Sequence, residues 1–519
     1  MKKKSTIIAL ILCAAMIAGI LAGCSGTPNG GGGSEPDGSS GGGTAKDTIV
    51  VASQTEPTTL GTCDHAALAS DYVNQLIYSG LTRVDENNEM VGDIAESWEQ
   101  VSDTEWIFHL REDVYFHNGE HLTADDVVAT LYWVQGFEAS STYALSFATA
   151  IETVDEYTVR IVTEVPVATL LYYLSNHANF IVPKSLIDSG NDFNENPVGC
   201  GPYKFVSWDA GEKLTFEAFE DFYEGAPAIQ HLTYMIIPES SSRTMALQSG
   251  DVDYVIQVNA PDYELLVADE NVEVLEKPGT SLNHMMLNNA VAPFNDENFR
   301  KAVNAAINKQ DIVDGALYGL ASPAVAQTPD MLAGTVTTNA DEYDVELAKQ
   351  YMEAWGGDPA DATFTVMCSN DTKVKIAEII QAALSEIGIT MKIESCDTAA
   401  YLAQTAPGVG EYQAAIGGYN HSSMYNFANY EFLSTAMGGG TRSQAQYEDV
   451  DELLIKAGST VDPEENLAVL EELSATLNDR CIYIPLYSDY NLRAYNKDLG
   501  GVQINGSNEN NWRTLYWKS

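Results

Sequence analysis

Apolar and polar positions alternate along the chain with two different periods, which predicts a fold built from both strands and helices. Residues 48–53 (Thr-Ile-Val-Val-Ala-Ser) and 106–110 (Trp-Ile-Phe-His-Leu) have the short apolar runs of buried strands. A helix is predicted to begin after Thr123, which can cap its first turn, with Asp126 at the third helical position as a weak capping box. The sequence shows no internal repeat.

The clearest supersecondary unit spans residues 364–393. Residues 364–367 (Phe-Thr-Val-Met) form a predicted strand, and residues 389–393 (Ile-Thr-Met-Lys-Ile) form the next one. Between them lies a predicted helix that ends at Gly388. Its apolar face consists of Ile376, Ile380, Ala383, Leu384 and Ile387. Strand, helix and strand in this order predict a right-handed crossover and a locally parallel sheet.

Two further elements are predicted in the C-terminal part. A helix is expected from Asp462 and Pro463, because proline is favoured at the first helical position. It leads into a predicted strand at residues 482–487, and a shorter apolar strand is predicted at 414–418. The apolar face of the helix is predicted to consist of Leu467, Leu470, Leu473 and Leu477.

The first 47 residues have the pattern of an export signal and a tether. In residues 1–23, three lysines precede an uncharged apolar stretch and small residues, as in a secretory signal peptide. Residues 21–24 (Leu-Ala-Gly-Cys) resemble the bacterial lipobox, in which the cysteine, here Cys24, carries the lipid. Residues 24–47 are rich in Gly and Ser, which predicts a flexible tether. We expect a protein on the extracellular face of the cell membrane, attached only through this lipid.

Charge and length narrow the possible functions. The chain carries 74 Asp and Glu against 26 Lys and Arg, and such a field repels nucleic acid and anionic surfaces. We expect no nucleic-acid partner; the charge is typical of a soluble acidic coat, and a preference for cationic solutes is the alternative. A chain of 519 residues is too long for one hydrophobic core, so two or three domains are expected. The folded part has no GxSxG nucleophile elbow, no HExxH, no P-loop and no GxGxxG after a strand, so no enzyme and no cofactor are predicted.

Five cysteines remain beyond the leader and the lipid site. An odd number cannot all pair internally, and no Cys/His spacing suits zinc, so buried free thiols are expected. Cys368 ends one predicted strand and Cys396 lies just past another. If the strands are neighbours, the two thiols lie within disulfide reach under oxidising conditions. The five are Cys63, Cys200, Cys368, Cys396 and Cys481.

A series of short motifs is spread over nearly the whole mature chain. They are 77–81 (Ile-Tyr-Ser-Gly-Leu), 94–98 (Ile-Ala-Glu-Ser-Trp), 108–111 (Phe-His-Leu-Arg), 116–127 (Phe-His-Asn-Gly-Glu-His-Leu-Thr-Ala-Asp-Asp-Val), 197–203 (Pro-Val-Gly-Cys-Gly-Pro-Tyr), 247–253 (Leu-Gln-Ser-Gly-Asp-Val-Asp), Asn288, 293–294 (Pro-Phe), 299–302 (Phe-Arg-Lys-Ala) and 306–309 (Ala-Ile-Asn-Lys). In this order they resemble the family 5 extracellular solute-binding proteins, which include oligopeptide-, dipeptide- and nickel-binding proteins.

Most of these motif residues have a structural interpretation. Gly199 and Gly201 are expected in a tight turn with positive φ, and Gly119 in a turn between strand and helix. Trp98 and Arg111 are expected to support packing rather than to touch a solute.

The resemblance implies an α/β fold of the periplasmic-binding-protein-like type II (cluster C), with two main lobes, a hinge and an inserted smaller domain. The implied domain I is discontinuous (48–79, 187–275 and 483–519), domain II spans 80–186, and domain III spans 276–482. The solute is expected in the cleft between domains I and III, which close on it. The implied partners are a small solute and the permease subunits of an ABC importer, and a monomer is expected.

The candidate binding residues lie mainly in a predicted loop that runs from residue 417 to 427. We select Asn283, Tyr419, Asn420, His421, Tyr425 and Asn426. The dipeptide-binding relatives carry an Asp in the matching stretch, which pairs with the terminal amine of the peptide. This loop has no carboxylate, and a neutral loop cannot supply the charge-assisted bond that an ammonium favours. A small free dipeptide is therefore disfavoured, while longer peptides held through their backbone, and sugars, stay open.

A peptide or peptide-like solute is our expectation, with hydrogen bonds from Asn420 and Asn426. The first alternative is an oligosaccharide, on which the tyrosines of this loop could stack. The second is chelated nickel, since the nickel-binding relatives place a histidine in this part of the cleft, where His421 lies. A single histidine makes a weak metal site, so no metal ligand is predicted.

Three histidines lie close together in the sequence. The histidines at 109, 117 and 121 straddle a strand and a turn, and a structural role is expected for them. A surface glycoside hydrolase or an adhesin is the rival class of protein. Turnover of an oligosaccharide, in place of saturable binding, would separate the two.

Overall fold

One large mixed sheet runs through most of the described chain. The computed structural model describes residues 46–64, 67–138, 144–407, 412–435 and 442–519. The main path of the sheet is β16-β15-β17-β13-β18-β11-β1-β10-β9-β8, and β12 and β14 also pair with β18. The strands are β1 (Thr48–Ser53), β8 (Tyr203–Asp209), β9 (Lys213–Ala218), β10 (His231–Ile236), β11 (Tyr254–Val255), β12 (Val272–Pro278), β13 (Ser281–Leu287), β14 (Ala321–Pro323), β15 (Thr363–Cys368), β16 (Thr390–Ser395), β17 (Ala414–Asn420) and β18 (Ile484–Asn496).

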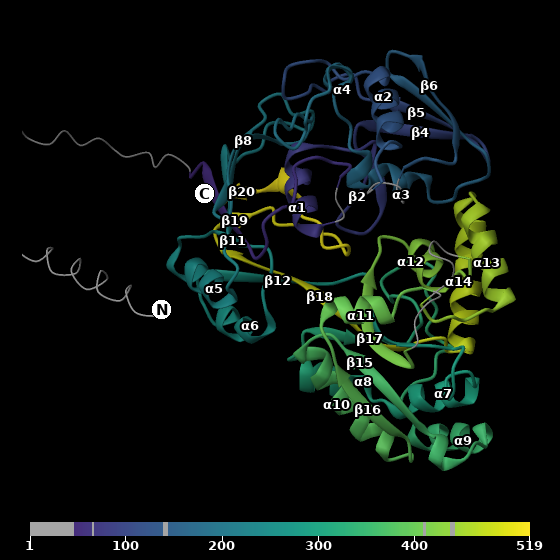
Figure 1. Ribbon diagram of the computed structural model, residues 1–519. Coiled ribbons are helices and arrows are strands. Elements are labelled where there is room, and N and C mark those ends of the chain that lie inside the picture. Colours follow the sequence, from purple (N-terminus) through teal and green to yellow (C-terminus); the bar gives the residue numbers. More distant parts are fainter. Residues whose placement is uncertain (1–45, 65–66, 139–143, 408–411, 436–441) are drawn as a thin grey trace, which may run out of the picture. The chain divides into compact units, whose positions relative to one another are not determined.

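Strand β18 connects two parts of this sheet (Figure 1). One part consists of β13, β15, β16 and β17, and the other consists of β1 and β8 to β11. The first residues of β18 pair with β13, and its last residues pair with β11 and β12. The sequence predicted a strand at residues 482–487 only and gave no prediction for the polar stretch from Ser488 to Asn491. In the structure these residues pair with β14 and β12, which satisfies their backbone groups.

A separate four-stranded antiparallel sheet lies within residues 80–186. Its order is β4-β5-β7-β6, and α2 packs against β6 and β7. The predicted capping box is confirmed, since the Thr123 backbone N–H donates to the Asp126 carboxylate at 2.9 Å and the reciprocal bond is present. These strands are β4 (Ala95–Ser102), β5 (Glu105–Leu110), β6 (Ala148–Asp155) and β7 (Thr158–Thr163). Two small sheets pair β2 (Thr82–Val84) with β3 (Met90–Gly92), and β19 (Leu499–Gly500) with β20 (Tyr516–Trp517).

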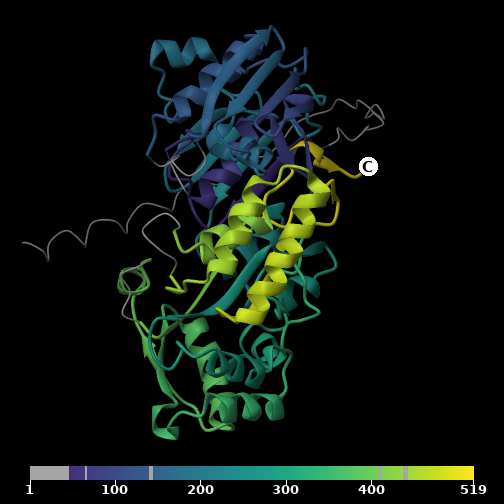
Figure 2. The ribbon, with the colours of Figure 1, turned by 90° about the vertical axis from the view of Figure 1, so that its right-hand side faces the viewer.

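The helices cover the sheets or connect their strands. Strands β15 and β16 are parallel and flank α10, which confirms the predicted strand-helix-strand unit. Helix α14 begins at Pro463, capped by Asp462 as predicted, and lies beside α13 (Figure 2). The α-helices are α1 (Leu68–Ile77), α2 (Ala124–Val134), α3 (Leu170–Ser175), α4 (Lys184–Ser189), α5 (Ser240–Ser249), α6 (Ala260–Val267), α7 (Glu297–Ala306), α8 (Lys309–Ala316), α9 (Val345–Trp355), α10 (Asp371–Ser385), α11 (Thr398–Gln404), α12 (Met424–Phe432), α13 (Glu448–Ser459) and α14 (Pro463–Arg480).

The buried apolar residues form several separate clusters. One cluster comes from β1, α1 and the strands β8 to β11, together with the C-terminal residues Leu499, Trp512 and Leu515. A second is built mainly from residues 81–181. Two more lie within 282–487, on opposite faces of the β13–β17 part of the large sheet. The domain boundaries themselves stay a prediction.

Several sequence predictions need correction. Gly199 and Gly201 do not have positive φ; a Cβ on either would lie 2.1–2.6 Å from backbone atoms of Ile77, so close approach requires glycine there. The prediction for Gly119 is confirmed, with φ of 86°. Leu467 is 40% exposed and does not belong to the buried face of α14, whereas Leu470, Leu473 and Leu477 do.

The predicted proximity of two cysteines is confirmed. The Cys396 backbone N–H donates to the Cys368 carbonyl oxygen at 3.0 Å, and Cys396 Sγ lies 3.7 Å from the same oxygen. Both thiols are free, and a disulfide between them stays a prediction. The predicted signal peptide, Cys24 and the predicted tether up to residue 45 lie outside the described residues. Within the described ranges, no helix combines the length and apolarity that a membrane span requires.

Candidate functional site

The candidate site begins at the C-terminal end of strand β17. The predicted loop from 417 to 427 is wrong, because β17 continues to Asn420 and helix α12 starts at Met424. Only residues 421–423 connect the two elements. Ser423 caps α12 by accepting a hydrogen bond from the Asn426 backbone N–H at 3.2 Å, which the sequence pattern Ser-Met-Tyr-Asn allows. Tyr419 and Asn420 therefore lie on a strand, while Tyr425 and Asn426 lie in the first turn of a helix.

The outer edge of β17 has no strand partner over its last four residues. On one side β17 pairs with β13 along its whole length, from Ala414 to Asn420. On the other side β15 pairs only with Ala414 and Ala415. The next carbonyl, of Ile416, accepts the hydroxyl of Tyr401 at 2.9 Å. Among the described residues, no strand covers the edge from Gly417 to Asn420, and an edge of this kind can accept an added extended chain.

Asn283 on β13 lies opposite the C-terminal end of β17 and donates a hydrogen bond to the carboxylate of Asp489. It pairs with Gly418, and a Cβ on Gly418 would lie 2.5 Å from Asn283 Oδ1, so the asparagine side chain requires glycine opposite it. Asn283 Nδ2 donates to Asp489 Oδ2 at 2.7 Å, and Ser281 Oγ donates to the same oxygen at 3.2 Å. The two neighbours on β13 thus orient a carboxylate from β18 beside the exposed Gly418 and Asn420.

Asp489 combines exposure with a perturbed pKa. The residue is exposed to solvent, yet desolvation by the surrounding protein raises the pKa of its carboxyl, and the hydrogen bonds from Asn283 and Ser281 oppose this shift. A group that solvent reaches and protein largely surrounds lies in a concave part of the surface. Within the part of the chain that the structure describes, no Lys, Arg or His nitrogen forms an ion pair with it.

The Asn420 side chain is already bound within the protein. Its Oδ1 accepts from Thr280 Oγ1 at 2.6 Å, and its Nδ2 donates to the Ser507 carbonyl at 3.3 Å. It therefore connects β17 to the start of β13 and to the C-terminal segment, and its amide is less available to a solute than the sequence suggested. The Asn426 side chain, by contrast, makes no hydrogen bond with any described residue.

His421 and Tyr419 belong to an aromatic group. The His421 ring lies 5.5 Å from the Tyr430 ring and 6.0 Å from the Phe427 ring, and Tyr419 lies 5.2 Å from Tyr430. Arg442 lies over the Tyr419 ring at 4.9 Å. Burial lowers the pKa of His421 to about 4, so the imidazole is neutral at physiological pH.

Tyr425 borders a cavity of about 630 Å³. One wall comes from residues 88–106 and 168–172, and the other comes from residues 331–333, 422–425 and 460–470. This cavity thus lies between the predicted domains II and III, whereas the sequence led us to expect the solute between domains I and III. Its volume falls within the range of roughly 300–1,000 Å³ that is typical of small-molecule sites.

The other histidines make protein contacts. His117 Nε2 lies 3.0 Å from the Gly201 carbonyl, and burial lowers its pKa to about 4. His109 contacts Glu99 at 3.3 Å, and His121 contacts the Glu112 carbonyl at 2.8 Å. In the described ranges, no group of three or more His, Cys, Asp or Glu side chains is arranged to hold a metal ion.

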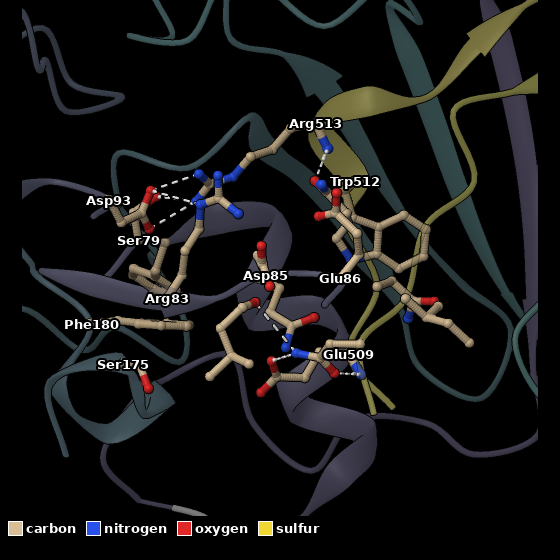
Figure 3. Close-up of a pocket in the computed structure, with 17 residues that line it drawn as sticks. Ser79, Arg83, Asp85, Glu86, Asp93, Ser175, Phe180, Glu509, Trp512 and Arg513 are labelled. Atoms are coloured by element: carbon tan, nitrogen blue, oxygen red, sulfur yellow. Dashed lines mark hydrogen bonds and ion pairs between the residues drawn. The ribbon is translucent and has the colours of Figure 1, made fainter. Parts of the chain in front are cut away.

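A second cavity is small and is lined in part by a network of paired charges (Figure 3). Its volume is about 80 Å³, too little for a peptide or a sugar. Arg513 donates to both Asp93 oxygens at 2.6 and 2.9 Å and to Glu224 at 3.1 Å. We interpret this network as a joint that attaches the C-terminal segment to the residues that flank β2 and β3 and to Glu224, with charges that compensate one another.

Fold and site together define a solute-binding protein: a type II periplasmic-binding-protein architecture with an open strand edge and a cavity of ligand size. The sequence profile of the "Bacterial extracellular solute-binding proteins, family 5 Middle" matches residues 89–440. The chain belongs to this family, as its sequence motifs led us to expect.

Relatives and solved structures agree with this assignment. The chain is 27% identical to the probable D,D-dipeptide-binding periplasmic protein DdpA of Escherichia coli K12 over 89% of its own length and 92% of that protein. It is 26% identical to the oligopeptide-binding protein AppA of Bacillus subtilis, with 97% of each covered. Among solved structures, HbpA2 from Haemophilus parasuis has a TM-score of 0.82 at 23% identity, covering 91% of this chain and 100% of that one. AppA of B. subtilis in complex with a nonapeptide has a TM-score of 0.72 at 24% identity, covering 92% and 100%.

Sequence reasoning missed the residues that come from distant segments. Asp489 lies some 70 positions after β17, just beyond the strand predicted at 482–487, and only the pairing of β13 with β18 brings it to Asn283. Trp98 was expected to pack only, but it lines the 630 Å³ cavity, as do Trp106 and Tyr172. Arg111 matches its predicted packing role, since it contacts Asp113 and the Tyr223 carbonyl.

Proposed function

We propose that this protein captures an extracellular peptide or peptide-like solute and delivers it to the permease subunits of an ABC importer. The observation that carries the proposal is the edge of β17 from Gly417 to Asn420, which no described strand covers and which is followed by residues 422–425 in the lining of a cavity of ligand size. The family to which the chain belongs consists of solute-binding proteins rather than enzymes, and this favours solute capture over the alternative of a hydrolase or an adhesin.

An uncovered strand edge favours a peptide because it binds the part that all peptides share. An extended peptide that pairs with β17 forms backbone hydrogen bonds regardless of its sequence. Its side chains then point alternately to the two faces of the sheet, and Tyr425, on the helix that follows β17, lines the cavity. In this arrangement Tyr419 packs on the bound chain, and the free amide of Asn426 binds one of its polar groups.

Asp489 supplies the carboxylate that the 417–427 segment lacks. In our proposal the terminal ammonium of the peptide, or another cationic group, binds the free oxygen of this carboxylate, while Asn283 orients the other oxygen. The names of two relatives, a D,D-dipeptide-binding and an oligopeptide-binding protein, agree with ligands of this class.

The sugar and nickel alternatives have weaker support. His421 packs on Phe427 and Tyr430, and in the described ranges it belongs to no group of three or more side chains arranged to hold a metal ion. An oligosaccharide has no peptide backbone that could pair with an open strand edge, although tyrosines can stack on it.

Delivery completes the proposed function. We propose that Cys24 carries a lipid, that residues 24–47 act as a tether, and that the folded part works as a monomer on the extracellular face of the cell membrane. The strongly acidic surface argues against a second attachment to anionic lipid headgroups.

Calorimetry on the full-length protein tests the proposal. We expect saturable binding of peptides of three to nine residues, and none of maltooligosaccharides or of nickel with histidine. Replacing single backbone amides of a bound peptide by N-methyl amides should weaken binding roughly tenfold at alternate positions, because each lost hydrogen bond costs about 1–1.5 kcal/mol. Equal affinity of all N-methylated peptides would contradict strand pairing, and binding of sugars or nickel alone would contradict the peptide proposal.

A further inference from the structure

The cavity beside Tyr425 is uncharged in an otherwise highly charged protein. It is lined by 22 of the described residues, and none of them is Asp, Glu, Lys, Arg or His. In the whole chain, 19% of the residues are charged. Most of the lining side chains are apolar or aromatic, and the remaining ones are neutral amides and hydroxyls.

Its first wall is aromatic and belongs to the four-stranded sheet. Trp106 on β5 lies opposite Gln100 on β4, and Trp98 lies two residues before Gln100. Tyr172 on α3 extends this wall. Trp106 is only 6% exposed, and its Nε1 is buried without a hydrogen-bond partner in the part of the chain described. A buried N–H without a partner is costly, so such a donor is suited to an acceptor that arrives with a ligand.

The second wall includes apolar residues that do not belong to the buried core. Leu467 and Met331 are 40% and 43% exposed, yet both line the cavity. Leu467 thus lines the cavity and does not join the buried face of α14. Met424, at the start of α12, and Leu470 connect the wall to the buried cluster beneath it.

The two walls meet at a direct contact between distant segments. The Ala168 backbone N–H, just before α3, donates to the Gly458 carbonyl on α13 at 3.0 Å. Tyr425 lies against the same glycine, where a Cβ would come within 2.3 Å of its hydroxyl oxygen. The cavity is therefore bounded at this end by packed backbone, beside the short connection from β17 to α12.

We infer that this cavity is a subsite for a bulky uncharged group of the solute, such as the side chain of Leu, Phe or Trp, and that Trp106 Nε1 donates to an acceptor on the bound solute. The inference rests on the proposed function and specifies its substrate class. Apolar groups gain by leaving water for such a cavity. A Glu or Lys side chain would lose its hydration there and find no opposite charge.

A peptide series on the full-length protein tests the inference. The series consists of Ala-Xaa-Ala-Ala and its positional isomers, in which Xaa is Leu, Phe, Trp, Glu or Lys. At one position at least, the Leu, Phe or Trp peptide should bind 10- to 100-fold more tightly than the Glu and Lys peptides. Equal affinities at every position would overturn the inference.

Two substitutions locate the effect. Gln100→Glu places a carboxylate in the cavity and should weaken binding of the Leu, Phe and Trp peptides at least tenfold, while Gln350→Glu adds the same charge to an exposed position of α9 and should leave binding unchanged. Trp106→Phe keeps an aromatic ring and removes the donor, so binding should weaken about tenfold. Unchanged binding in Gln100→Glu would overturn the subsite, and unchanged binding in Trp106→Phe would overturn the assigned hydrogen bond.

A neutral fluorescent probe separates this inference from the proposed function. N-phenyl-1-naphthylamine is uncharged and aromatic, so its fluorescence should increase with the wild-type protein and with Gln350→Glu, and much less with Gln100→Glu. If this pattern holds while no peptide binds, the subsite stands and the peptide function fails. If the probe binds wild type and Gln100→Glu equally, the subsite fails even where peptides bind.

Discussion

Replacing Asp489 by Asn removes the proposed anchoring charge with little change in shape. The Asn side chain keeps an oxygen that can accept the hydrogen bonds from Asn283 Nδ2 and Ser281 Oγ. In the wild-type protein the distance from Asn283 Nδ2 to Asp489 Oδ2 is 2.7 Å. What the Asn side chain loses is the negative charge beside Gly418 and Asn420. The substitution therefore separates recognition of a ligand cation from support of the strands.

The expected loss of affinity follows from the strength of a charge-assisted bond. A hydrogen bond to a charged group contributes about 1.5–3 kcal/mol, which corresponds to roughly 10- to 150-fold in the dissociation constant. Asp489→Asn should weaken binding of a peptide with a free amine by this factor. It should not change binding of the same peptide with an acetylated amine, which has no ammonium to pair.

The stability of the empty protein should change in the opposite direction. Because the pKa of Asp489 is raised in the folded protein, the folded state holds this proton more tightly than the unfolded state does. Stability from this group is complete below the ordinary carboxyl pKa and is lost as the pH rises through the raised value. At neutral pH the Asn variant should therefore melt at the same or a higher temperature than wild type. For the same reason, ammonium binding by wild type should weaken as the pH falls through the raised pKa.

Calorimetry of both peptides and thermal melts of the empty protein provide the measurements. Asp361→Asn is the matched control, since it removes the same charge from an exposed turn. Equal affinities of Asp489→Asn and wild type for the free-amine peptide would refute the assignment. A lower melting temperature together with weaker binding of both peptides would instead give Asp489 a structural role.

Three further predictions concern delivery, packing and thiols. Cys24→Ala should release protein into the medium, measured by immunoblot of cell and medium fractions; retention at wild-type levels would contradict lipid attachment. Leu473→Ala should lower the unfolding free energy by about 2–5 kcal/mol, because Leu473 is fully buried. Leu467→Ala on the same helix should change it by less than about 0.5 kcal/mol in urea unfolding, and equal effects would be inconsistent with the fold. Under diamide a Cys368–Cys396 disulfide should appear in peptide mass spectra, and its absence at full oxidation of other thiols would show that the proximity is insufficient.

Local pattern was enough to predict the elements whose signals lie within the element. The capping box at Thr123, the β15-α10-β16 unit and the start of α14 after Asp462 each depend on a few neighbouring residues, and each is confirmed. The predicted apolar face of α14 failed at Leu467, because periodicity distinguishes apolar from polar positions but not a core from the wall of a cavity.

The candidate site was predictable only in part, because it is assembled from distant segments. Tyr425, a candidate from the 417–427 segment, lines the cavity, but Trp106 comes from a different sheet. Asp489 reaches Asn283 through a register between β13 and β18 that no single segment encodes. Asn420 resembled a free polar loop residue, while its amide is in fact shared between Thr280 and Ser507.

Native mass spectrometry of the protein, purified from its own cells without denaturation, tests the central claim most directly. A binding protein that encloses its solute often retains it, so the intact protein should carry a non-covalent adduct that collisional activation releases. The account predicts that fragmentation of the released adduct gives a peptide with at least one bulky uncharged side chain. An adduct with the mass and fragments of an oligosaccharide or of a nickel complex would contradict it.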